Sequence, residues 1–139
     1  MRRLAVLLIA LCLSLPAFAE QKKTFGDLDV HYSAFTSGYL QPDIAAANGL
    51  TRSKKLGVMN IAVLKAGKAT TANVSGTMKD LLGKDYPLSF KAVNEGEAIY
   101  YLAQFPLESQ EMLRFTINVS VSGGATNSFE FNQELYPGE

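Results

Sequence analysis

Alternation of apolar and polar residues with a period of two constrains this chain more than any other feature. The clearest example is MLRFTINVSV (112–121), in which Leu113, Phe115, Ile117, Val119 and Val121 share one face and polar residues occupy the other. A half-buried strand has this period, whereas a helix would scatter the same apolar residues around its axis. We therefore predict a strand over 112–121.

Further segments extend the pattern. Those that alternate are 27–35, 71–78, 87–93 and 128–135. Two others, 58–65 and 98–105, are apolar on both faces, as expected for central strands or for strands overlaid by a loop. Turn-forming links such as Asn94–Glu95–Gly96 are short, so neighbouring strands should be antiparallel. The pattern predicts an all-β fold, an antiparallel seven-stranded immunoglobulin-like β-sandwich, with a small closed barrel as the alternative.

One segment, PDIAAAN (42–48), predicts a short helix between the first two strands. Pro42 suits the first helical position, Asp43 favours the helix dipole, and Gly49 can supply the left-handed residue that ends the helix. A helix this short is not stable alone. We expect it to dock on the strands through Ile44 and Leu50, with Tyr39 and Leu40 as further contacts.

The N-terminus has the order of a secretory signal peptide. A basic start at Arg2 and Arg3 precedes the apolar run LAVLLIALCLSL, and small residues at Ala17 and Ala19 form an A-x-A site. The run is shorter than the roughly 20 residues that span a bilayer. We predict cleavage after Ala19, a single mature domain over 20–139, and a bacterial periplasmic location.

The charge balance excludes one class of partner. Removing Arg2 and Arg3 from the 13 basic residues leaves 11 against 13 acidic residues, a net charge of about −2. Nucleic-acid binding proteins carry a strong basic excess, so no nucleic-acid partner is expected. No second apolar segment reaches bilayer length, so the mature chain should not be an integral membrane protein. The expected partner is an unknown periplasmic protein or a small ligand.

A basic loop, TRSKK (51–55), is the first candidate binding site. Arg52 can form a bidentate contact with a carboxylate or phosphate, and Lys54 and Lys55 add positive charge, so Arg52, Ser53 and Lys54 are candidate binding residues. The alternative is a solvated loop in which Arg52 pairs with a nearby acid. Asn60 lies in an otherwise apolar strand and needs hydrogen-bond partners if it is buried. We expect Asn60 to tie this loop to the sheet.

His31 is the only histidine. It alternates with Asp27 and Asp29, which would allow a general base or a weak carboxylate–imidazole cluster; the alternative is an ordinary exposed strand face. Cys12 would be removed with the leader, so no second His or Cys remains to complete a zinc site, and no metal or cofactor is expected. No nucleophile elbow and no phosphate loop occurs.

These features favour a non-catalytic binding or protein-interaction module rather than an enzyme. A small-molecule carrier with an apolar pocket between the sheets is the alternative. An enzyme that uses His31 is a third hypothesis.

The segments VHYSAF (30–35), YLQPDIAAANGLTRSKKLGVMNIAVLK (39–65) and GEAIYYLAQF (96–105) resemble the DUF4426 family of proteobacterial periplasmic proteins, a domain of unknown function. The resemblance spans about 25–139. It implies a small secreted β-domain without an assigned activity. It also implies that His31–Tyr32, Arg52–Ser53–Lys54 and Asn60–Ile61 recur in the family, and it brings no catalytic residues.

Overall fold

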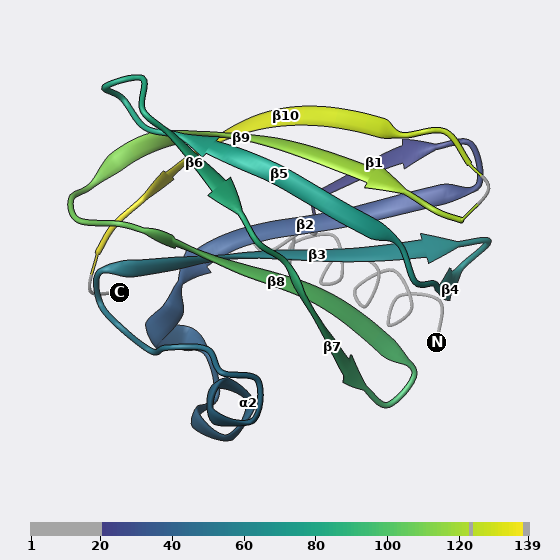
Figure 1. Ribbon diagram of the computed structural model, residues 1–139, viewed down its shortest axis with the longest axis horizontal. Coiled ribbons are helices and arrows are strands. Elements are labelled where there is room, and N and C mark those ends of the chain that lie inside the picture. The colour runs from purple at the N-terminus through teal and green to yellow at the C-terminus, as the bar shows by residue number, and fades with distance from the viewer. Residues whose placement is uncertain (1–20, 123, 138–139) are drawn as a thin grey trace, which may run out of the picture.

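The computed structural model describes residues 21–122 and 124–137 (Figure 1). The predicted leader and its cleavage site lie outside these residues. The elements are β1 (Gln21–Phe25), β2 (Leu28–Thr36), the 3-10 helix η1 (Ser37–Tyr39), α2 (Pro42–Ala47), β3 (Leu56–Lys65), β4 (Lys68–Ala69), β5 (Asn73–Lys79), β6 (Asp85–Leu88), β7 (Lys91–Glu95), β8 (Ala98–Pro106), β9 (Glu111–Ser120) and β10 (Asn127–Leu135). None of the helices in this part of the chain is long and apolar enough to cross a membrane.

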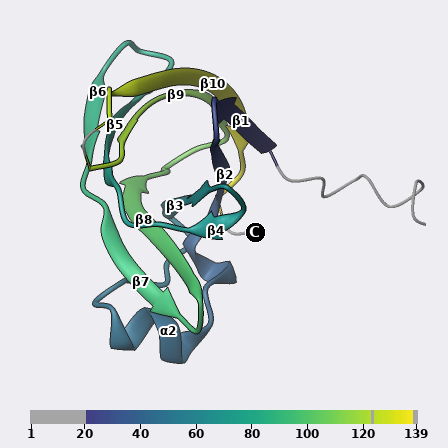
Figure 2. The same ribbon diagram turned by 90° about the vertical axis from the view of Figure 1, so that its right-hand side faces the viewer.

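The strands form two antiparallel sheets and not one closed barrel. The larger sheet has the order β1-β2-β3-β8-β7, with β4 added at one end of β3. The smaller sheet has the order β10-β9-β5-β6. Figure 2 shows the two sheets nearly end-on, with β6 in the smaller sheet leading directly into β7 in the larger one.

The expected count of seven strands is wrong, because ten form within the described residues. The predicted strand 87–93 breaks into β6 and β7, since the chain crosses from one sheet to the other at Ser89–Phe90. Beyond the crossing, Ala92 is exposed and Val93 is buried, whereas continuous alternation from Leu88 through Phe90 would place Ala92 inward. The short strands β1 and β4 were not predicted. The helix consequently lies between the second and third strands.

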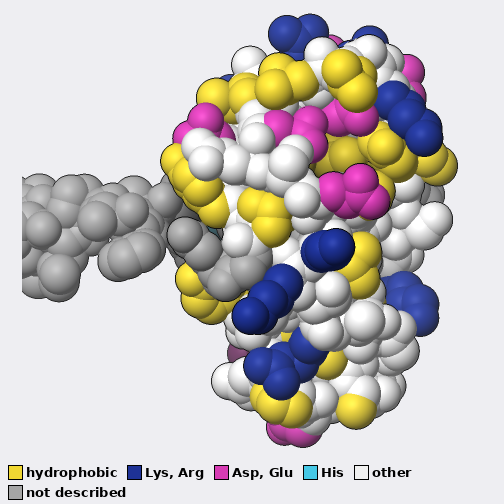
Figure 3. All heavy atoms as spheres, turned by 90° about the vertical axis from the view of Figure 1, so that its left-hand side faces the viewer, with side chains coloured by type: hydrophobic (Ala, Val, Ile, Leu, Met, Phe, Trp, Pro, Cys, Tyr) yellow, Lys and Arg dark blue, Asp and Glu magenta, His cyan; other side chains and the backbone are white. Residues whose placement is uncertain are grey.

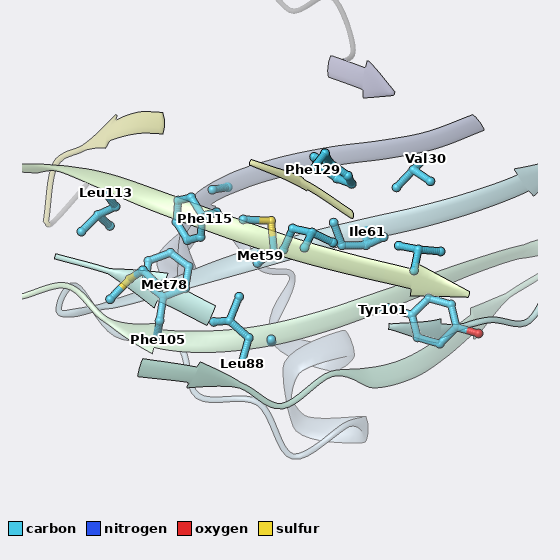
Figure 4. Close-up of a cluster of buried hydrophobic side chains, with 14 of the residues drawn as sticks. Val30, Met59, Ile61, Met78, Leu88, Tyr101, Phe105, Leu113, Phe115 and Phe129 are labelled. Carbon is cyan, nitrogen blue, oxygen red and sulfur yellow. The ribbon is translucent and has the colours of Figure 1, made fainter. Parts of the chain in front are cut away.

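The two sheets bury one hydrophobic core between them (Figure 4). Met59, Ile61 and Phe105 come from the larger sheet, and Phe115 and Ile117 come from the smaller one; each is at most 2% exposed. The rings of Phe105 and Phe115 meet edge-on with centroids 5.2 Å apart, a favoured aromatic geometry. These large side chains occupy the space that separates the sheets.

Helix α2 covers part of the outer face of the larger sheet, as Figures 1 and 2 both show. Leu40 and Ala45 pack there with Val58, Val93 and Leu102 in a second buried cluster. This contact explains why β3 and β8 are apolar on both faces: they are interior strands of the sheet and one outer face lies under the helix. The prediction of central or overlaid strands is confirmed.

Helix α2 begins at the residue predicted from the sequence and ends at the predicted glycine. Pro42 is the first helical residue, and Gly49 has φ = 67°. The Leu50 amide donates to the Ala45 carbonyl at 2.8 Å and the Gly49 amide to the Ala46 carbonyl at 3.5 Å, the two bonds of a Schellman motif. The helix therefore stops where the sequence predicts and turns the chain back toward β3.

Candidate binding site

The basic loop before β3 is tightly fastened to η1. Ser37 is fully buried. Its hydroxyl accepts a hydrogen bond from the Ser53 amide at 2.7 Å and donates one to the Ser53 carbonyl at 2.8 Å. Arg52 Nη2 donates to the Gly38 carbonyl at 3.2 Å. Ser53 and part of Arg52 therefore hold the loop in place.

Lys54 and Lys55 remain exposed on this loop. The Lys55 carbonyl accepts a hydrogen bond from the Leu107 amide at 2.8 Å, which joins the basic loop to the β8–β9 loop. The side chain of Lys54 forms no hydrogen bond or ion pair with the residues that the structure describes. Lys54 is thus the member of the triplet most available to a partner.

Asn60 does not tie the basic loop to the sheet, contrary to the prediction. Its Oδ1 atom is buried and has no hydrogen-bond partner among the described residues. Gln104 on β8 makes the connection instead: its Nε2 donates to the Thr51 carbonyl at 2.7 Å, and its Oε1 accepts from the Thr51 amide at 3.0 Å. Asn60 lies too far along β3, opposite Ser33 and Leu102, to reach the loop.

His31 lies away from the basic loop. It is partly buried in the middle of β2, opposite Ala62 of β3. Ala62 is six positions beyond Leu56, so His31 is about 20 Å from the start of β3, at roughly 3.3 Å per residue. The predicted residues therefore do not assemble into a single site.

The remaining sequence candidates near His31 have structural contacts. The ring centroid of Tyr32 is 5.0 Å from that of Phe129 and 4.4 Å from that of Phe131, so Tyr32 packs at the seam between the sheets. Asp29 accepts a hydrogen bond from the Thr24 hydroxyl at 2.7 Å, and Asp27 belongs to the β1–β2 turn. Tyr32 thus packs between the two sheets, and Asp29 helps to join β2 to β1.

A second surface, which the sequence did not predict as a site, lies at the tip of the β5–β6 hairpin. Leu81 is 68% exposed and Leu82 is 95% exposed. Asp80 fixes the turn that carries them, because its Oδ1 accepts from the amides of Leu82 at 3.0 Å and Lys84 at 2.9 Å. Gly83 completes the turn with φ = 83°. A defined turn therefore presents two leucines to solvent.

A cleft of about 750 Å³ adjoins these leucines. The β5–β6 turn forms one wall and the segment from Pro106 to Glu111 forms the other. The two walls are connected, because the Leu81 amide donates to Glu111 Oε1 at 3.3 Å. The volume lies within the range of roughly 300–1,000 Å³ that is typical of ligand pockets.

The exposed large hydrophobic residues gather at this end of the molecule. We call it the leucine end: it comprises the β5–β6 turn (80–84), the β8–β9 loop (107–110) and residues 136–137 after β10, at the left of Figure 1, together with the segment between β2 and β3 (37–55), which runs below the sheets through α2. The large hydrophobic side chains exposed among the described residues are Tyr39, Leu81, Leu82, Met112 and Tyr136. Each belongs to this end or to the first residues of β9 beside it.

Figure 3 views the leucine end directly. Hydrophobic and acidic side chains lie over its upper part, with basic side chains at the top and upper right edges, and further basic side chains lie over the lower part. The opposite end carries the remaining turns, with charged residues such as Glu95 and Glu97. The basic loop within this end was a sequence candidate, whereas the only sequence signal for the β5–β6 turn was a Leu-Leu pair between charged residues.

The DUF4426 family model, described as a domain of unknown function, matches residues 22–138. The chain belongs to the DUF4426 family. The predicted resemblance is therefore confirmed. A DUF4426 family protein from Pseudomonas aeruginosa PAO1 has a sequence 51% identical to this one. Its crystal structure superposes with a TM-score of 0.82, and the alignment covers 86% of this chain and 97% of that one. None of the curated proteins searched matches the chain.

Two more distant structures share the fold of this DUF4426 protein. A copper-bound variant of FetP from uropathogenic Escherichia coli strain F11 is 12% identical, with a TM-score of 0.58, covering 86% of this chain and 95% of that one. FetP as isolated after expression in the periplasm of Escherichia coli is 12% identical, with a TM-score of 0.54, and the alignment covers 86% of this chain and 97% of that one. At this identity the likeness concerns the fold alone.

Proposed function

We propose that this DUF4426 protein is a non-catalytic binding module of the bacterial periplasm and that its interaction surface is the leucine end. The observation that carries the proposal is the pair Leu81–Leu82, held outward by a hydrogen-bonded turn beside a cleft of about 750 Å³. Clustered exposed apolar side chains rimmed by polar residues are typical of interaction sites. Their preformed backbone also lowers the entropy lost on binding.

The fold supports this use of the leucine end. The proposal includes the immunoglobulin-like sandwich expected from the sequence, in which loops gather at the two ends and rigid strands position them. Here the loops of one end are linked by the Leu107–Lys55 and Leu81–Glu111 hydrogen bonds. Arg52 and Lys54 lie on the same end and extend the proposed surface with positive charge.

The periplasmic location rests on the leader pattern at the N-terminus. The FetP protein with the related fold was expressed in the periplasm, which is compatible with such a location. The proposal assigns no copper or other metal to this chain. Within residues 21–122 and 124–137, no group of three or more His, Cys, Asp or Glu side chains could hold a metal ion.

A small-molecule carrier is the second candidate, and the cleft favours it. Large buried side chains fill the space between the sheets, which weighs against the central pocket that this hypothesis expected. The cleft at the leucine end has a suitable volume for a ligand, so a carrier would use that end. An enzyme that uses His31 has no support from the geometry; full activity of a His31→Ala protein in restoring a deletion strain would count against it.

The proposal is tested by capturing partners on the mature protein, tagged at its N-terminus, in periplasmic extracts of the native host. Partners retained by the wild type should be lost with Leu81→Ser/Leu82→Ser and retained with Glu95→Ser/Glu97→Ser at the opposite end. An identical set of proteins on the wild type and the leucine variant would reject this surface. Loss with Arg52→Ala/Lys54→Ala would extend the surface to the basic loop.

A further inference from the structure

The cleft at the leucine end combines apolar and acidic walls. The apolar part of its lining comes from Met78, Leu81, Leu82, Tyr86 and Pro106. Asp80, Glu108 and Glu111 bring three carboxylates, against a single ammonium group. A partner that fills this cleft must therefore cover apolar surface and negative charge together.

The single ammonium group does not neutralise the carboxylates. Lys84 Nζ lies 5.2 Å from the centroid of the Tyr86 ring, in a cation–π contact. The ion pair that joins β5 to β6, between Lys79 and Asp85 at 3.8 Å, uses neither Lys84 nor a carboxylate of the lining. Glu108 is exposed and has no hydrogen-bond or ion-pair partner within the described part of the chain. The carboxylate of Glu108 is thus available to a partner, whereas Asp80 and Glu111 already accept hydrogen bonds from the two walls.

We infer that the cleft at the leucine end, rather than the basic loop beside it, binds a cationic amphipathic segment of a partner protein, in which Lys or Arg residues alternate with large apolar ones. The inference rests on the proposed function and adds the chemistry of the partner. Apolar side chains would contact Leu81 and Leu82, and a basic group would reach Glu108. Charge complementarity of this kind selects partners and speeds association, because an unpaired charge buried at an interface is costly.

Two other occupants suit the cleft less well. An anionic lipid surface would bring phosphates against Glu108 and Glu111. A symmetric contact between two copies, centred on the cleft, would place the carboxylates of one copy against those of the other, since a two-fold interface uses the same patch twice. Both arrangements set like charges together, which disfavours binding.

The test measures fluorescence anisotropy of two labelled peptides of equal length, one alternating leucine and lysine and the other leucine and glutamate. We expect the lysine peptide to bind about tenfold more tightly, and Glu108→Lys to remove most of that preference. Leu81→Ser/Leu82→Ser should weaken binding of the lysine peptide about tenfold. Glu95→Lys/Glu97→Lys at the opposite end makes a larger change in overall charge and should leave both affinities within about twofold.

Equal affinity for the two peptides, with both weakened by the leucine variant, would overturn the inference and leave the leucine end as a binding surface. Binding unaffected by the leucine variant would overturn the inference and count against the surface as well. A loss with Glu95→Lys/Glu97→Lys equal to that with Glu108→Lys would show attraction to overall charge and also overturn it. Self-association in sedimentation, or flotation with phosphatidylglycerol vesicles, that requires Leu81 and Leu82 would assign the surface to a second copy or to lipid instead.

Discussion

The buried hydroxyl of Ser37 exchanges two hydrogen bonds with the backbone of Ser53, at 2.7 Å with its amide and 2.8 Å with its carbonyl. This pair joins the end of β2 to the basic loop across the α2 excursion. These two hydrogen bonds make the segment between Ser37 and Ser53 a fixed part of the leucine end. Ser53 therefore has a structural role, and Lys54 next to it is left for contacts with a partner.

Replacing Ser37 by alanine should lower the free energy of unfolding by about 1–3 kcal/mol, since the Ser53 amide would lose its partner and the Ser53 carbonyl would keep only the longer bond from the Leu56 amide at 3.4 Å. Ser89→Ala is the matched control, because Ser89 is exposed between β6 and β7 and its change should stay within about 0.5 kcal/mol. Urea unfolding measures both. Equal stability of the two variants would show that the Ser37–Ser53 pair contributes little.

Gly57 on β3 leaves room for the ring of Phe105. A Cβ atom at position 57 would overlap that ring, whereas a Cβ atom at Gly38 would meet no heavy atom within 4 Å. Gly57→Ala should therefore cost about 1–3 kcal/mol by overpacking, and Gly38→Ala should cost much less. Adding Phe105→Leu to Gly57→Ala should recover part of the loss, and strict additivity in denaturant unfolding would contradict the proposed overlap.

The two adjacent tyrosines of β8 differ in their contacts. Tyr101 is buried, and its hydroxyl accepts a hydrogen bond from the Ala72 amide at 2.9 Å. Tyr101→Phe should lower stability by about 0.5–1.5 kcal/mol. Tyr100→Phe is the control on the opposite face of the same strand and should be nearly neutral, as thermal or urea unfolding would show. A larger loss for Tyr100→Phe would contradict this assignment.

Replacing a buried leucine and replacing an exposed leucine at the same end of the molecule should change the free energy of unfolding by very different amounts. Leu107, in the β8–β9 loop, is fully buried, whereas Leu82 is 95% exposed. Leu107→Ala should cost about 2–5 kcal/mol, because it opens a cavity. Leu82→Ala should change the free energy of unfolding by no more than about 0.5 kcal/mol. A destabilisation by Leu82→Ala comparable to that by Leu107→Ala would mean that Leu82 is needed for folding, which would weaken its assignment to binding.

Local signals in the sequence were sufficient for most of the fold. The helix at Pro42–Ala47 was predictable because Pro42 and Gly49 act on their own backbone. The alternation in MLRFTINVSV fixed the buried face of β9, since each residue reports its own side of the strand. β1 was missed because QKKTF is an almost fully exposed edge strand, and its pairing with β2 depends on backbone contacts that leave no apolar pattern.

The candidate site was less predictable, because it depends on which distant residues meet. An amide in an apolar strand suggested that Asn60 would fasten the basic loop, yet Gln104 on the neighbouring strand has the correct register for that role. The Leu-Leu pair of the β5–β6 turn resembles residues that pack beneath a loop. In the structure, the turn held by Asp80 leaves both leucine side chains exposed to solvent.

Site-specific photo-crosslinking in the living host tests the binding role of the leucine end most directly. A photoreactive phenylalanine analogue is placed at position 82, or at position 97 on the opposite end as the control, in the full chain. The account predicts a discrete crosslinked species from position 82 that is absent from position 97 and is reduced by Leu81→Ser. Crosslinks from position 97 alone, or none from position 82 when the protein is present at native levels, would contradict it.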